Sequence, residues 1–324
     1  MLNVISADNY LKVNILRNEM AKKAKRSYSE DITLTEYRDH TKAFNWFPGH
    51  MAKAMKQVGE KLKMVDIVLE LRDARIPLLS GNEDLKKVLG NKCRLIVLNK
   101  VNLCDPEKLA DWKKWFDDNG EHHIFINVLD RNAVKLITEK SREIVVANRI
   151  ASGGSGEKTR KFRMMMVGLP NTGKSTLINS LGGRKAAKSG DKPGLTQSQQ
   201  WIKLAGDIEL LDTPGIMPRK IETREEGMWL CATHAIKDQI LGQEEVACFV
   251  VEYLMKYFPK NLEEKYNIDK LATSSGEVLE QISLSRGFIK KKGVADFDRT
   301  FATVLSDFRK GELGLITFEN IPML

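Results

Sequence analysis

The sequence has few cysteines and no long apolar run. Its four cysteines, Cys93, Cys104, Cys231 and Cys248, lie far apart in a chain of 324 residues and form no C-x-x-C pair. This spacing argues against a zinc site or a disulfide scaffold and favours buried thiols in a reducing compartment. No stretch approaches the roughly 18 apolar residues of a membrane span, which argues against an integral membrane protein. With 42% hydrophobic and 29% charged residues, the chain also lacks the composition of a disordered protein.

Acidic residues are scarce in one part of the chain, and the formal net charge of +9 is concentrated there. The stretch from Arg149 to Lys192 holds ten basic residues, opposed only by Glu157 and Asp191, a net +8. From Met217 to the end the net charge is −2. The basic excess therefore favours a polyanionic ligand near residues 149–192, since a charge of this sign attracts phosphates.

The length predicts about two domains. Short apolar runs separated by helical patterns predict a mostly parallel α/β sheet for residues 44–222. Strand signals nearly vanish afterwards, and residues 223–324 are predicted to form a smaller, all-helical domain. Residues 1–43 form an extension that is acid-poor before Glu30, and two interpretations stay open: a mitochondrial transit segment or a solvated amphipathic helix. The predicted strands are 65–71, 94–98, 124–126, 162–167 and 208–211; the named helices are 106–119, 174–181, 243–257 and 297–308.

A phosphate-binding loop is predicted between a strand and a helix. Residues 168–175 (GLPNTGKS) fit the pattern G-x-x-x-x-G-K-[ST]. The glycines let backbone N–H groups surround a phosphate, and the helix N-terminus adds positive potential. Lys174 is predicted to reach the β- and γ-phosphates, and the Ser175 hydroxyl to bind Mg²⁺. The other nucleotide-binding residues predicted in this loop are Asn171, Thr172, Gly173 and Thr176.

Two further segments are suited to Mg²⁺ and the γ-phosphate. Asp212 ends an apolar strand 38 residues after Lys174 and is predicted to hold Mg²⁺, while the Gly215 N–H contacts the γ-phosphate. Thr196 lies in a polar loop between them and offers a hydroxyl that closes over Mg²⁺.

The base-binding segment is predicted at Asn99-Lys100-Val101-Asn102, directly after a strand. Guanine-binding proteins place N-K-x-D at such a strand end, and the Asp accepts two N–H bonds from the base. Asn102 offers one acceptor and also a donor, so either guanine selectivity is reduced or another group, such as Asp105, compensates. Asn99 precedes Lys174 by 75 residues, the reverse of the usual order, which predicts a circularly permuted GTPase domain.

Together these motifs resemble the circularly permuted ribosome-assembly GTPases of the RbgA/YlqF type, including their mitochondrial ribosome-associated members. The resemblance rests on residues 47–51 (FPGHM), 73–77 (DARIP), 193–201 (PGLTQSQQW) and 307–311 (DFRKG). It implies GTP hydrolysis coupled to late maturation of the large ribosomal subunit, a C-terminal domain that contacts rRNA, and stimulation by the ribosomal particle. The long, acid-poor segment before Phe47 favours a place in the mitochondrial matrix and support of mitochondrial translation, and the resemblance implies peripheral association with the inner membrane.

The resemblance assigns two further roles. Ile216 follows Asp212-Thr213-Pro214-Gly215, where many GTPases carry a water-orienting Gln, and an isoleucine cannot position water. The family's substitute is the histidine of its F-P-G-H-M motif, here His50, although His50 also fits an ordinary surface histidine. Asn171 resembles the asparagine that lets related GTPases use K⁺.

Three functions compete for this sequence. The first is a GTPase that leaves the immature subunit after hydrolysis, and the second is a nucleotide-gated binding module with negligible hydrolysis, favoured by Ile216 and Asn102. The third, a P-loop small-molecule kinase, fits poorly because the sequence has no Arg-rich lid insertion. The basic runs 184–192 and 290–292 suit RNA phosphates or solvated loops, and no aromatic residues interleave with them to stack on bases.

Overall fold

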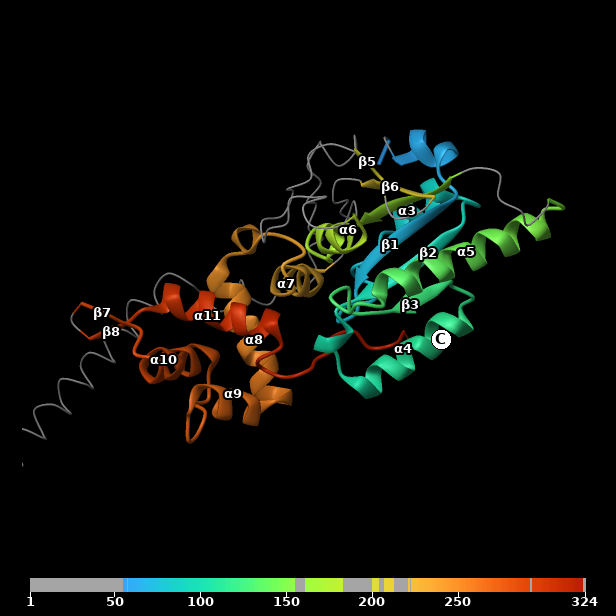
Figure 1. The fold of residues 1–324 in the computed structure, drawn as a ribbon. Helices are drawn as coiled ribbons and strands as arrows, with labels where there is room; N and C mark the ends of the chain where they lie inside the picture. The colour runs from blue at the N-terminus through green and yellow to red at the C-terminus, as the bar shows by residue number, and fades with distance from the viewer. Residues whose placement is uncertain are drawn as a thin grey trace, which may run out of the picture.

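One six-stranded sheet organises the part of the chain that precedes α7 (Figure 1). In this computed structural model the described residues are 55–56, 58–154, 161–182, 200–203, 207–212, 221, 223–291 and 293–322. The strand order is β3-β2-β1-β4-β6-β5; all neighbours pair in parallel except β5, which runs antiparallel to β6 at the edge. The strands are β1 (Ile67–Asp73), β2 (Arg94–Asn99), β3 (His123–Phe125), β4 (Phe162–Gly168), β5 (Gln200–Lys203) and β6 (Ile208–Asp212).

Helices cover both faces of this sheet. Every residue of β1 is buried, as expected for a central parallel strand covered on both sides. Ile67, Leu69 and Leu71 share a core with α5 (Ala133–Ala151) and α6 (Lys174–Gly182) on one face. Val68 shares the opposite core with α3 (Glu83–Leu89), and α4 (Pro106–Asp118) covers β2 on that side through Trp112 and Phe116.

The region after the sheet is built from helices that pack around one apolar core. It also contains a two-stranded antiparallel hairpin, which the sequence patterns did not predict. No helix among the described residues is long and apolar enough to cross a bilayer. The elements are α7 (Arg224–Ala232), α8 (Gln243–Tyr257), α9 (Pro259–Tyr266), α10 (Ser275–Ser285), β7 (Ile289–Lys290), β8 (Val294–Ala295) and α11 (Phe297–Lys310), and short 3₁₀ turns occur at η2 (Leu62–Met64), η3 (Val101–Leu103) and η4 (Asp238–Ile240).

After α11 the chain returns to the sheet. We call residues 311–322 the C-terminal tail; its course toward α4 is visible in Figure 1. The Ile316 N–H donates to the Leu103 carbonyl at 2.9 Å, and the Phe318 N–H donates to the Arg75 carbonyl at 2.9 Å. The tail therefore joins the helical region to the loops that follow β1 and β2.

One expectation about the cysteines needs correction, and one strand was missed. Cys104 and Cys231 are buried as predicted, but Cys93 and Cys248 are only partly buried. Strand β5 was not among the predicted strands, because a four-residue edge strand (QWIK) has too short an apolar alternation to stand out.

Candidate nucleotide-binding site

The phosphate loop joins β4 to α6 and is shaped by two glycines. Gly168 has φ +150°, and a Cβ at this position would lie 2.3 Å from the Leu71 carbonyl oxygen. Gly173 has φ +106°, and its Cβ would lie 2.3 Å from Asn99 Nδ2. Both positions require glycine, because a side chain would meet atoms that hold the loop against the neighbouring strands.

Lys174 is buried and bends back over this loop. Its Nζ donates to the Gly168 carbonyl at 3.0 Å and to the Leu169 carbonyl at 2.6 Å. The Thr172 hydroxyl also donates to the Leu169 carbonyl, at 3.0 Å. The predicted phosphate-binding ammonium is thus held at the loop, where a phosphate oxygen can replace the carbonyls. Ser175 and Thr176 follow in the first turn of α6 and are partly buried.

Asn99 connects the base-binding segment to the phosphate loop. Its side chain is 2% exposed; Nδ2 donates to the Thr172 carbonyl at 2.8 Å, and Oδ1 accepts from the Val128 N–H at 3.0 Å. The side chain predicted to bind nucleotide therefore joins three segments: the end of β2, the phosphate loop and the segment after β3.

The next residues of this segment, Lys100 and Asn102, lie differently. Lys100 adopts the left-handed conformation (φ 69°), and its Nζ lies 2.8 Å from Asp73 Oδ2. Burial lowers the pKa of Lys100, although the charge of Asp73 opposes this effect. Asn102 is exposed in the turn η3. The Asp105 side chain accepts the Glu107 N–H at 2.9 Å and caps α4, so it is already engaged.

Asn171 links the phosphate loop to the helical region. It adopts the left-handed conformation (φ 54°), and its Nδ2 donates to the His234 carbonyl at 2.8 Å, just beyond α7. Leu169 of the same loop belongs to the apolar core of the helical region, together with Leu230 of α7. The phosphate loop is therefore in direct contact with that region.

The predicted Mg²⁺ residues are described only in part. Asp212 ends β6 and pairs with Met166 of β4, two residues before Gly168. This register places the Asp212 backbone beside the phosphate loop, although its side chain lies outside the described residues. His50, Thr196 and Gly215 lie wholly outside the described residues, as does Ile216.

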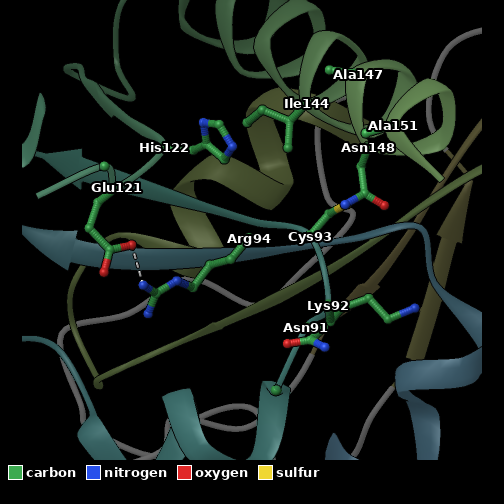
Figure 2. A pocket seen from close by; sticks show the side chains of 12 residues that line it. Asn91, Lys92, Cys93, Arg94, Glu121, His122, Ile144, Ala147, Asn148 and Ala151 are labelled. Atoms are coloured by element: carbon green, nitrogen blue, oxygen red, sulfur yellow. Dashed lines mark hydrogen bonds and ion pairs between the residues drawn. The ribbon is translucent and has the colours of Figure 1, made fainter.

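A cavity of about 460 Å³ opens at the opposite edge of the sheet (Figure 2). It lies at the amino ends of β2 and β3, beside α5. Arg94 enters it and pairs with Glu121 and, at 3.1 Å, with Glu70. Burial raises the pKa of the nearby Cys93 thiol. This cavity contains none of the predicted nucleotide-binding residues.

Four contributors at the nucleotide edge were not predicted from the sequence. Asp73 and Arg75 were noticed only as part of a motif, and the Val128 N–H and His234 carbonyl were not considered. Asp73 and Asn99 end adjacent parallel strands and are partners in the register. Because parallel strands place their carboxyl ends at one edge, the polar residues that end β1 and β2 were a usable signal.

The fold and the phosphate loop define a P-loop GTPase whose sheet is circularly permuted, since β1 to β3, with the base-binding segment, precede the phosphate-loop strand β4 in the chain. Residues 163–283 match the family model described as 50S ribosome-binding GTPase. Ribosome biogenesis GTPase A of Priestia megaterium is 42% identical over 277 residues, covering 85% of this chain and 96% of the relative. The chain belongs to the ribosome biogenesis GTPase A (RbgA/YlqF) family.

Two more distant relatives agree with this assignment. Mitochondrial ribosome-associated GTPase 1 of Xenopus tropicalis is 30% identical, covering 85% of this chain and 94% of the relative. The crystal structure of GNP-bound YlqF from T. maritima superposes with a TM-score of 0.58 at 25% identity, covering 82% of this chain and 97% of that one.

Proposed function

We propose that the protein binds GTP across the carboxyl edge of the sheet and hydrolyses it to GDP and phosphate during late assembly of the large ribosomal subunit. The observation that supports this most is the Asn99 side chain, which joins the base-binding segment to the phosphate loop through the Thr172 carbonyl at 2.8 Å. Such a link sets the spacing between base and phosphates before a nucleotide arrives, which lowers the ordering cost of binding.

The residues of the phosphate loop fit Mg²⁺ with a nucleotide. Ser175 in the first turn of α6 and Asp212 at the end of β6 would hold the ion, with Thr196 closing over it. Mg²⁺ commonly binds through one or two protein oxygens plus substrate phosphates, and it neutralises charge that develops on the phosphates. Lys174 would exchange its two carbonyl partners for the β- and γ-phosphates. The Gly215 N–H would contact the γ-phosphate, and His50 would orient the attacking water.

The ribosomal and mitochondrial parts of the proposal rest on relatives. The names ribosome biogenesis GTPase A and mitochondrial ribosome-associated GTPase 1 support action on a ribosomal particle, the second one in the mitochondrion. Residues 44–222 would form the GTPase domain and residues 223–324 the part that contacts rRNA. Peripheral association with the inner membrane belongs to the same proposal and is tested by fractionating mitochondria with and without high salt.

The decisive experiment measures phosphate release by the full chain with and without purified large ribosomal subunits. We expect turnover to rise at least tenfold with subunits. His50→Ala should retain GTP affinity and lose most of this stimulation, because it removes the group that orients water. His122→Ala is the matched control, since His122 is exposed in the cavity at the far edge.

The alternative, a nucleotide-gated binding module, predicts GTP-dependent binding to subunits without stimulated phosphate release. That result would overturn the hydrolytic proposal, and unchanged turnover in His50→Ala would remove His50 from it. Repeating the assay with NaCl in place of KCl tests whether K⁺, held through Asn171, contributes.

A further inference from the structure

A buried carboxylate with two cationic partners lies at the nucleotide edge of the sheet. Asp73 is 3% exposed, and each of its oxygens accepts two hydrogen bonds. Oδ1 accepts the Arg75 backbone N–H at 3.1 Å and Arg75 Nε at 3.0 Å. Oδ2 accepts Arg75 Nη2 at 2.8 Å and lies 2.8 Å from Lys100 Nζ.

These contacts leave Asp73 no means of touching a nucleotide itself. Oδ1 is already bonded to Arg75, Oδ2 is bonded to Arg75 and Lys100, and the side chain is buried. Burial alone would raise the pKa of Asp73, but the charges of Arg75 and Lys100 outweigh it and hold the pKa well below its usual range. The group is therefore a fixed anion whose role is to hold its two cations.

Lys100 is the partner that matters for binding. It is the second residue of the base-binding segment. The ends of β1 and β2 are held together directly before it, because the Ala74 N–H donates to the Asn99 carbonyl at 2.8 Å. A free lysine side chain loses rotamer entropy when it is ordered. Because Asp73 holds the ammonium in advance, the Lys100 stem is ordered before a base arrives.

We propose that Asp73, braced by Arg75, is a positioning residue for base recognition that acts through Lys100. It fixes the Lys100 ammonium at the end of β1, and so orders the Lys100 stem within the base-binding segment. This inference rests on the proposed function, because it needs the base of GTP or GDP to lie on the segment from Asn99 to Asn102.

The other end of β1 provides a matched control. Asp66 is also buried, and it binds Arg149 Nη2 at 2.9 Å and the Arg163 N–H at 2.8 Å. Asp66→Asn and Asp73→Asn remove the same charge from buried sites at opposite ends of β1, Asp66 directly before the strand and Asp73 at its last residue. Only Asp73 lies at the nucleotide edge, so the pair separates a loss of stability from a loss of positioning.

The test is a double-mutant cycle on GDP affinity in the full chain, with melting temperatures measured in parallel. Lys100→Met keeps the stem and removes the ammonium. We expect Asp73→Asn to weaken GDP binding at least tenfold and Asp66→Asn less than twofold. In the Lys100→Met background, Asp73→Asn should have little further effect, because its route of action is already absent.

Each outcome is decisive. Additive effects of Asp73→Asn and Lys100→Met, or equal weakening by Asp66→Asn, would overturn the positioning role. If Asp73→Asn does not fold, Asp73→Glu keeps the charge between the two cations but displaces it by one methylene, and it should show the same coupling to Lys100. A wild-type chain that binds no GDP would instead refute the proposed function, so the two failures can be told apart.

Discussion

Asn102 is the residue at which this chain departs from the usual guanine-binding sequence. A carboxylate there accepts two N–H bonds from guanine, whereas an amide accepts one and presents a donor. Asp105 caps α4 through one carboxylate oxygen, and both oxygens of Asp73 are occupied. We therefore expect base selectivity at this edge to depend on residue 102 itself.

We predict that Asn102→Asp tightens GTP binding at least tenfold and reduces the affinity for XTP. The carboxylate restores two acceptors for guanine, whereas xanthine presents a carbonyl where guanine has an amine and is repelled. Affinities for GTP, XTP and ATP measured by competition against a fluorescent nucleotide provide the check. Asn91→Asp makes the same exchange at an exposed position beside the far cavity and should change none of them. Equal GTP affinity in wild type and Asn102→Asp would contradict this account.

At the scale of elements, the phosphate loop was predictable because its sequence pattern depends on local geometry. Glycine at 168 and 173 follows from the backbone conformation and from the close approach of Leu71 and Asn99. The partners of the loop were not predictable in the same way. The Asn171 bond to the His234 carbonyl joins residues 63 positions apart, and no local pattern marks a backbone carbonyl as a partner.

The strands also divide into those that their own sequence predicts and those that depend on a neighbour. The apolar runs of β1, β2, β4 and β6 were recognised from sequence; β1 begins and ends two residues later than predicted, and the other three strands extend one residue further. β5 is held by pairing with β6 at the sheet edge, so its stability comes from a neighbour and not from its own pattern. The hairpin of β7 and β8 is two residues long on each side, which is below the length that periodicity can detect.

Gly173→Ala tests the link between the phosphate loop and the base-binding segment. The new Cβ would approach Asn99 Nδ2 to 2.3 Å at a φ of +106°, so the Asn99 bond to Thr172 must break or the loop must shift. We expect GTP and GDP affinity to fall at least a hundredfold and the free energy of unfolding to fall by roughly 1–3 kcal/mol. Isothermal titration and thermal unfolding measure the two effects.

Gly276→Ala is the control for this substitution. Gly276 lies in α10, and a Cβ there meets nothing within 4 Å. Alanine should therefore leave nucleotide binding unchanged and slightly stabilise the helix, since alanine has the higher helix propensity. Wild-type nucleotide affinity in Gly173→Ala would show that the close approach is relieved without cost to the site.

Across the whole molecule, the helical region holds the nucleotide edge from two sides. Asn171 and Leu169 connect it to the phosphate loop, and the C-terminal tail connects it to the turn that follows the base-binding segment. Arg309 of α11 also donates to the Ala232 carbonyl at 3.0 Å, which ties the end of α11 to the end of α7. Both loops at this edge therefore contact the helical region directly.

Glu319 is the tail residue whose ionisation this arrangement makes measurable. Its two carboxylate oxygens accept the N–H groups of Leu78 and Leu79, each at 2.7 Å. Burial raises the pKa of Glu319 to about 7, although these two hydrogen bonds oppose the rise. A carboxyl whose pKa is higher in the folded than in the unfolded chain favours folding when protonated. That contribution is complete below about pH 4.5 and is lost as the pH rises through about 7.

We therefore predict that wild type loses stability relative to Glu319→Gln between pH 5.5 and pH 8, by on the order of 1–3 kcal/mol. Glutamine stays neutral, so the variant does not lose this stability. The contributions of the other titrating groups are the same in both proteins and cancel in the comparison. Urea unfolding at the two pH values, followed by tryptophan fluorescence, measures the difference. Glu312→Gln on the same tail is the control: Lys265 lowers the pKa of Glu312, which stays ionised throughout this range, so its effect should be equal at both pH values. A pH-independent difference for Glu319→Gln would contradict a raised pKa of Glu319 in the folded chain.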